Sequence, residues 1–192
     1  MTAFARHQGV VTRTLDMTKD PLVAAYFAAS SACEKLYYSL LTGDDGWKNK
    51  KLSICKLDYK SLEMKLEKYK NEDLILNFFE ELPIHYLNPT FETNVNAIAQ
   101  DAVLLFQHRQ TPYNEKPVSE LPVDKLLSNY FEYFVEKYSL DKSLLQEVKL
   151  ITKSTIPVSE SPKMLVDLKE RGYHGSTMFP ATHKGAVEQS LV

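Results

Sequence analysis

Residues 20–41 read DPLVAAYFAASSACEKLYYSLL, which predicts the helix around which the rest of the chain is organised. Asp20 is a residue type that caps helices, and Pro21 suits the first helical position. The next residues are apolar on nearly every side of a helix, which is typical of a helix buried on most sides. The turn signal GDDG at residues 43–46 ends the pattern. We therefore expect a largely buried central helix that begins at Pro21.

Both helices and strands are predicted along the rest of the chain. Residues 51–57 alternate in the manner of a strand, and residues 148–152 are also strand-like. The other expected elements are helical pieces over 59–82 that stop before Pro83, a helix-to-strand passage over 97–106, a helix over 123–138, a helix from Ser161-Pro162 to Leu168 ended by Gly172, and a short helix from Thr182. Helices outnumber strands and separate them. We expect a single α/β domain of the mixed α+β kind over residues 1–192, with a small sheet and several helices.

Composition argues against several classes of function. The 23 basic and 25 acidic residues give a formal net charge of −2, so nucleic-acid binding is not indicated. No apolar run has the length of a transmembrane helix, and the first residues do not form a secretory signal, so no membrane association is expected. The two cysteines show no C-x-x-C spacing, which fits a reducing cytoplasm. The five histidines lack the spacing of a helical metal site, so no metal is expected.

Glycine is scarce, and this restricts how a nucleotide can be bound. The six glycines form neither G-x-G-x-x-G nor a P-loop, and G-x-S-x-G is absent as well. Backbone cradles for phosphate depend on such closely spaced glycines. An anionic ligand would therefore have to be held by side-chain donors, and arginine is the side chain suited to bidentate phosphate contact.

Polar residues are concentrated just before the central helix: Arg6, His7, Thr12, Arg13 and Asp16. One interpretation is structural, with Arg13 and Asp16 forming an internal ion pair. We expect Asp16 to be structural, orienting Arg13 or capping the loop. Asp16→Ala is then expected to cost about 3–5 kcal/mol, because breaking a buried pair leaves a charge without its partner. The other interpretation is a binding wall, in which Arg13 offers a planar fork to a phosphate and His7 supplies a titratable group. The residues alone favour the structural interpretation, because ion-pair networks are commoner than sites.

A basic run surrounds the turn after the helix. Residues 48–51 read KNKK, and the only tryptophan, Trp47, precedes them. We interpret the run as a solvated loop rather than a nucleic-acid patch, and Trp47 as exposed packing on the turn.

Residues 5–28, ARHQGVVTRTLDMTKDPLVAAYFA, resemble the central motif of the FRG domain family, which has the pattern H-x-G-x-x-T-R-x-L-D-x-T. The positions that match in place are His7, Gly9, Thr12, Arg13, Leu15, Asp16, Thr18, Pro21, Leu22, Ala24, Tyr26, Phe27 and Ala28. Weaker likenesses follow at residues 97–104, where Gln100 matches, and at residues 168–186. The F-R-G tripeptide itself belongs well upstream of the motif and is not in this chain. We expect either a shortened member or another chain that supplies the missing segment.

The resemblance implies a function only in outline. FRG domains occur in bacteria and phages, often near defence or toxin genes, and their order of motifs is similar to that of ADP-ribosyltransferases. In that scheme NAD is the candidate substrate and no cofactor is identified. Arg13, with Thr12, Arg6 and Asp16 beside it, binds NAD, while His7 and Gln100 are catalytic. Two functions follow: an ADP-ribosyltransferase-like toxin or effector, or a nucleotide-binding or interaction module without turnover, acting as a sensor, inhibitor or partner subunit. The departures at Asn96, Ala102 and Ala181 favour the second function.

Overall fold

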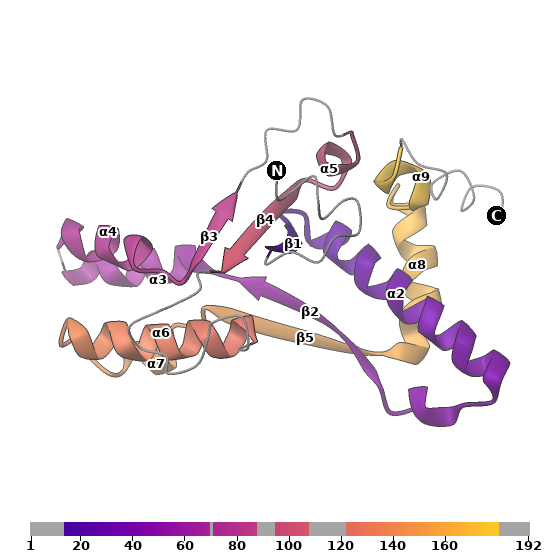
Figure 1. Ribbon diagram of the computed structural model, residues 1–192, viewed down its shortest axis with the longest axis horizontal. Helices are drawn as coiled ribbons and strands as arrows, with labels where there is room; N and C mark the ends of the chain where they lie inside the picture. Colours follow the sequence, from indigo (N-terminus) through magenta and orange to yellow (C-terminus); the bar gives the residue numbers. More distant parts are fainter. Residues whose placement is uncertain (1–13, 70, 88–94, 108–121, 181–192) are drawn as a thin grey trace. The chain divides into compact units, whose positions relative to one another are not determined.

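The computed structural model describes residues 14–69, 71–87, 95–107 and 122–180. Over these residues the predicted mixed α+β class is confirmed, with two small antiparallel sheets among helices (Figure 1). One sheet has the strand order β1-β4-β3, and the other pairs β2 with β5. The strands are β1 (Thr14–Thr18), β2 (Lys51–Leu57), β3 (Ile84–Leu87), β4 (Ala102–Gln107) and β5 (Ile151–Pro157).

Most of the described chain is helical, as the sequence predicts. The α-helices are α2 (Pro21–Thr42), α3 (Tyr59–Leu66), α4 (Glu72–Glu80), α5 (Val95–Ala99), α6 (Val123–Lys137), α7 (Leu144–Glu147), α8 (Ser161–Glu170) and α9 (Gly175–Met178). Within the described ranges, 3-10 helix η1 (Asp45–Trp47) follows α2, η2 (Glu67–Tyr69) lies between α3 and α4, and η4 (Val158–Glu160) precedes α8. No helix of the described ranges is long and apolar enough to cross a membrane. The short helix expected from Thr182 lies outside the described residues.

The chain divides into two compact units, each with its own core. Unit 1 comprises Met1–Leu15, Cys55–Leu87 and Leu105–Thr152, and unit 2 comprises Asp16–Ile54, Asn88–Leu104 and Lys153–Val192. Several boundaries between the units therefore fall within strands.

The predicted start and end of α2 are confirmed. The Asp20 carboxylate accepts a hydrogen bond from the backbone N–H of Leu22 at 2.7 Å, which caps the first turn next to Pro21. Gly43 ends the helix at φ +69°, a left-handed conformation that glycine adopts without steric cost. Its N–H donates to the carbonyl of Ser39, so one of the free carbonyls at the helix end is satisfied.

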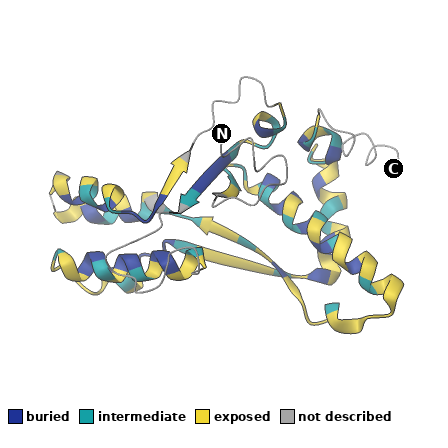
Figure 2. Ribbon diagram, viewed as in Figure 1, coloured by how far each residue is buried: buried dark blue, intermediate teal, exposed yellow. Residues whose placement is uncertain are grey.

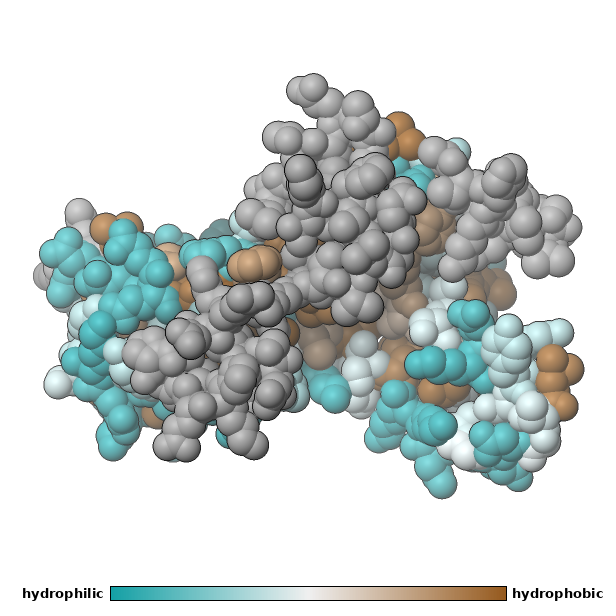
Figure 3. Space-filling view, in the orientation of Figure 1, coloured by the Kyte–Doolittle hydropathy of each residue, from teal (hydrophilic) through white to brown (hydrophobic). Residues whose placement is uncertain are grey.

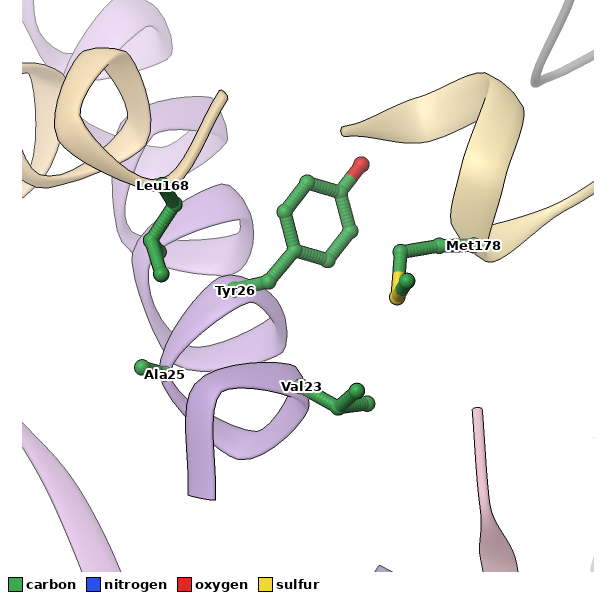
Figure 4. Packing of buried hydrophobic residues seen from close by; sticks show 5 residues of the cluster. All are labelled: Val23, Ala25, Tyr26, Leu168 and Met178. Atoms are coloured by element: carbon green, nitrogen blue, oxygen red, sulfur yellow. The ribbon is translucent and has the colours of Figure 1, made fainter. Parts of the chain in front are cut away.

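The core of unit 2 forms where α2 packs on α8 and α9. Tyr26 of α2 projects between Leu168 of α8 and Met178 of α9 (Figure 4). Val23 and Ala25 complete this buried cluster. A second cluster forms further along α2 and contains Ala32, Leu36, Leu52 and Val158.

The expectation that α2 is largely buried is correct for its first turns and wrong for its end (Figure 2). The exposed side chains are Tyr37, Tyr38, Leu40 and Leu41, each at least 60% exposed. The reason is length. At 1.5 Å per residue α2 is about 33 Å long, whereas α8 is about 15 Å long and covers only part of it. Hydrophobic residues accordingly reach the surface where α2 ends (Figure 3).

The core of unit 1 is an aromatic cluster between α4 and α6. The ring of Phe78 lies 5.0 Å, centroid to centroid, from those of Tyr130 and Phe134, and all three side chains are fully buried. The Tyr130 hydroxyl donates to the carbonyl of Phe78, which satisfies the one polar atom of this ring inside the core. The predicted helix over 123–138 is confirmed, because its buried residues follow the expected helical spacing.

Candidate functional site

The predicted site residues fall into two groups. Arg6, His7, Thr12 and Arg13 lie outside the described residues, so their roles stay predictions. Asp16 lies on β1, and Gln100 lies in the turn between α5 and β4. Arg13 immediately precedes β1 in the sequence, so the described end of the motif begins with the next residue.

Hydrogen bonds join three segments of unit 2 at the end of this motif. We call the group the polar circuit; its members are Thr18, Asp20, Gln100, Tyr173 and Met178. The Thr18 hydroxyl donates to the carbonyl of Gln100 at 2.7 Å and accepts from the backbone N–H of Asp20 at 3.0 Å. Tyr173 donates from its hydroxyl to the Asp20 carboxylate at 2.8 Å. The side-chain amide of Gln100 donates to the carbonyl of Met178 at 2.9 Å.

The polar circuit fixes the point where β1 passes into α2. One oxygen of Asp20 caps α2, and the other accepts from Tyr173, which lies beyond the end of α8. Thr18, the last residue of β1, is bonded to the turn that contains Gln100. The backbone N–H of Lys19 adds a hydrogen bond to the carbonyl of Asp101 at 3.2 Å. Asp101 has φ +42°, so the turn is tight there. The matched residues Thr18 and Gln100 are thus adjacent in unit 2.

The two polar atoms of the Gln100 side chain differ in their hydrogen bonding. Its Nε2 atom is engaged with Met178, while its Oε1 atom makes no hydrogen bond to any residue the structure describes. The side chain is half-buried. Gln100 can therefore present a carbonyl acceptor to a hydroxyl group of a ligand while its N–H stays fixed.

Asp16 is exposed, which changes the cost expected for its loss. The estimate of about 3–5 kcal/mol for Asp16→Ala required a buried pair. An ion pair at an exposed position is worth only about 0–1 kcal/mol, because water and salt screen it. The expected cost falls to that range.

Tyr173 and His174 are polar residues near the motif that the sequence analysis missed. His174 caps α9: its ring Nδ1 lies 2.8 Å from the Ser176 hydroxyl, and its backbone N–H donates to the Thr177 hydroxyl. Gly172, just before them, has φ +87° and ends α8 as predicted. Gly172 predicts a turn at this point of the sequence, but it does not indicate that Tyr173 and His174 make hydrogen bonds there.

Tyr173 gives the polar circuit a dependence on pH. Its hydrogen bond to the Asp20 carboxylate raises the pKa of Tyr173 above its ordinary value, and desolvation adds to the rise. Such a group stabilises the fold below the pKa of the unfolded chain, about 10, and the stabilisation is lost as pH rises through the higher folded pKa. We expect the difference in unfolding free energy between wild type and Tyr173→Phe to shrink above about pH 10. Urea unfolding at stepped pH measures it, and a difference that stays constant would contradict the assignment.

Within the described ranges no three or more His, Cys, Asp or Glu side chains are grouped to hold a metal ion. Both cysteines are free thiols, and Cys33 donates to the Ser161 hydroxyl at 3.3 Å.

Comparison with protein families finds one match. The family model of the FRG domain matches residues 1–36 of the 192. The matched range includes β1 and the first part of α2, while the later segments 97–104 and 168–186 lie outside it. Neither a curated protein nor a solved structure matches the chain.

Proposed function

We propose that this protein binds NAD through its FRG-like segment and transfers ADP-ribose from it, as an ADP-ribosyltransferase-like effector. The observation that carries the proposal is the family match over residues 1–36, which includes every polar residue of the motif. The polar circuit supports it, because Thr18 of the motif contacts Gln100. The scarcity of glycine supports it too, since phosphates must then be held by side chains.

Each residue has a defined part in the proposed reaction. Arg13, with Arg6 and Thr12 beside it, binds the pyrophosphate as a bidentate donor. The glycosidic bond between nicotinamide and the ribose breaks, and nicotinamide leaves with the bonding electron pair. A nucleophile, either water or an acceptor side chain, then bonds to the ribose carbon and gives up a proton. His7 binds the ribose, and the free Oε1 of Gln100 accepts from a ribose hydroxyl.

A second function, nucleotide binding without turnover, is favoured by one contact. The Gln100 amide donates to the carbonyl of Met178, so one of its two N–H donors serves the fold. In this alternative the domain is a sensor, an inhibitor or a partner subunit. Release of nicotinamide from NAD on incubation with the protein supports the enzyme, whereas saturable binding with no release supports the module.

The decisive variant for ligand binding is Arg13→Lys, which keeps the charge and removes the planar fork. A hydrogen bond to a charged group contributes about 1.5–3 kcal/mol. We therefore expect the affinity for NAD and ADP-ribose to fall by roughly tenfold to a hundredfold, measured by calorimetry. Arg171→Lys, the same change at an exposed position in unit 2, is the matched control and is expected to bind like wild type. If folded Arg13→Lys binds as tightly as wild type, or if wild type does not bind, an ion pair with Asp16 is the better account of Arg13.

A further inference from the structure

A cavity of about 610 Å³ lies in unit 2, between α2, η1 and the start of β2. Its volume is within the range of sites that hold small molecules, roughly 300–1,000 Å³. Ala32, Leu52 and Val158, which are buried core residues, form part of its wall. The cavity therefore has an apolar interior that continues into the core of the unit.

The rim of the cavity is cationic. Lys35, Lys50 and Lys51 line it, and all three are exposed. Among the described residues, no carboxylate lies within 4.0 Å of any of the three ammonium groups. Figure 3 shows hydrophilic side chains gathered over η1 and the start of β2. Residues 48–51 are thus not simply a solvated loop, because two of their lysines face a cavity.

The acidic residues of η1 do not neutralise this rim. Asp45 pairs with Lys48, which does not line the cavity, at 2.7 Å. The Asp44 carboxylate accepts from the backbone N–H of Gly46 at 2.8 Å and caps η1. The charge that faces the cavity is therefore positive, although the whole chain carries a net charge of −2.

Trp47 supplies the second observation. Its side chain lines the cavity and packs against the core of unit 2, so the expected exposed turn residue is in fact half-buried. The Nε1 atom is buried and has no hydrogen-bond partner among the described residues. A buried donor without an acceptor is costly, so the indole carries an unmet hydrogen bond next to the cavity.

We infer that this cavity binds a nucleoside phosphate, with the base against Trp47 and the phosphates on Lys35, Lys50 and Lys51. Base stacking on aromatic side chains and lysine contacts to phosphate are the interactions such a ligand requires. Ser31 and Ser53 line the same cavity, and a serine hydroxyl suits a ribose. This site shares part of α2 with the FRG-like segment, since Ala28 and Lys35 lie within residues 1–36. It contains none of the residues assigned to NAD and does not depend on the proposed ADP-ribosyl transfer.

Trp47 is the only tryptophan of the chain, so its fluorescence reports on this cavity directly. The probe is ADP, titrated against the wild type and against the Lys35→Gln, Lys50→Gln, Lys51→Gln triple variant. The matched control is a triple lysine-to-glutamine variant at exposed positions of unit 2 that do not line the cavity: Lys153, Lys163 and Lys169. We expect saturable quenching in wild type and control, and an affinity at least about tenfold lower in the cavity variant.

Three results would overturn the assignment: no saturable quenching by ADP, equal affinity in the cavity variant, or adenosine binding as tightly as ADP. Saturable quenching by oligothymidylate, without saturable quenching by ADP, would likewise contradict the assignment and would identify single-stranded nucleic acid as the ligand. Arg13→Lys separates this site from the proposed function. It is expected to leave quenching by ADP unchanged, so either site can fail without the other.

Discussion

Phe78→Ala is expected to lower the unfolding free energy by about 3–5 kcal/mol, which is a large part of the stability of a domain of this size. Phe78 is fully buried, and its ring contacts those of Tyr130 and Phe134 on α6. Removing it takes away buried apolar surface and leaves a cavity that the neighbouring rings fill only in part. The same variant also loses the aromatic contacts, which contribute beyond their area.

Circular dichroism during thermal or urea unfolding measures this effect. Trp47 is not a suitable reporter, because it belongs to unit 2 and Phe78 belongs to unit 1. At roughly 2–4 °C per kcal/mol for a chain of this length, the shift in Tm is easily detected. Leu76→Ala, on the same helix but 57% exposed, is the matched control and is expected to change Tm little. Equal effects of the two variants would show that the aromatic cluster does not form the core of unit 1.

Asp20→Ala is expected to lower the unfolding free energy by roughly 2–3 kcal/mol, combining two losses. The first is the cap of α2, since the carboxylate accepts from the Leu22 N–H. The second is the hydrogen bond from Tyr173. Asp20→Asn keeps a good capping group, and Tyr173→Phe removes only the second hydrogen bond, so both are expected to cost less than Asp20→Ala.

The double variant Asp20→Ala, Tyr173→Phe tests whether the two residues act together. If they do, its destabilisation is smaller than the sum of the two single changes. Trp47 fluorescence in urea suits this measurement, because all three residues belong to unit 2. Additive costs would mean that the contact between Asp20 and Tyr173 contributes nothing to stability in solution.

The sequence predicted the elements whose periodicity reflects burial. The bounds of α2 and β2 are correct, because the caps and the alternation lie in the chain itself. The strand expected at 148–152 is observed at Ile151–Pro157. The pairing with β2 sets these limits: Asp58 N–H donates to the carbonyl of Leu150, and Val158 N–H donates to that of Lys50. Four consecutive exposed residues in β5 carry no alternation from which this could be predicted.

The sequence does not predict the two short strands β1 and β3, or the hydrogen-bond partner of the first residue of α8. Strand β1 is only five residues long and β3 only four, and patterns this short are ambiguous. Helix α8 begins at Ser161 as predicted, and Glu160 occupies the N-cap position. The Ser161 hydroxyl instead donates to the carbonyl of Val158 inside the core. Such partners depend on the tertiary structure.

In the candidate site, Thr18 and Gln100 both match the FRG pattern, and the Thr18 hydroxyl donates to the backbone carbonyl of Gln100. Neither spacing nor composition pointed to Tyr173, which lies 153 residues after its partner Asp20. The lysine-lined cavity was missed for a similar reason. A basic run by itself predicts a solvated loop. That this run lies beside a cavity depends on the packing of α2, which also lines the cavity.

The polar circuit also sets the order in which the newly made chain can mature on the ribosome. The first turn of α2 is synthesised early, but Tyr173 follows Asp20 by 153 residues. At about 5–20 residues per second, the ribosome needs roughly 8–30 s to add them. The partners of β1 on β4 and the Gln100 turn are made about halfway through that interval, but the hydrogen bonds to Tyr173 and Met178 must wait for its end. The polar circuit is therefore complete only after translation of α8 and α9, and nascent chains arrested earlier have the cap of α2 without the hydrogen bond from Tyr173.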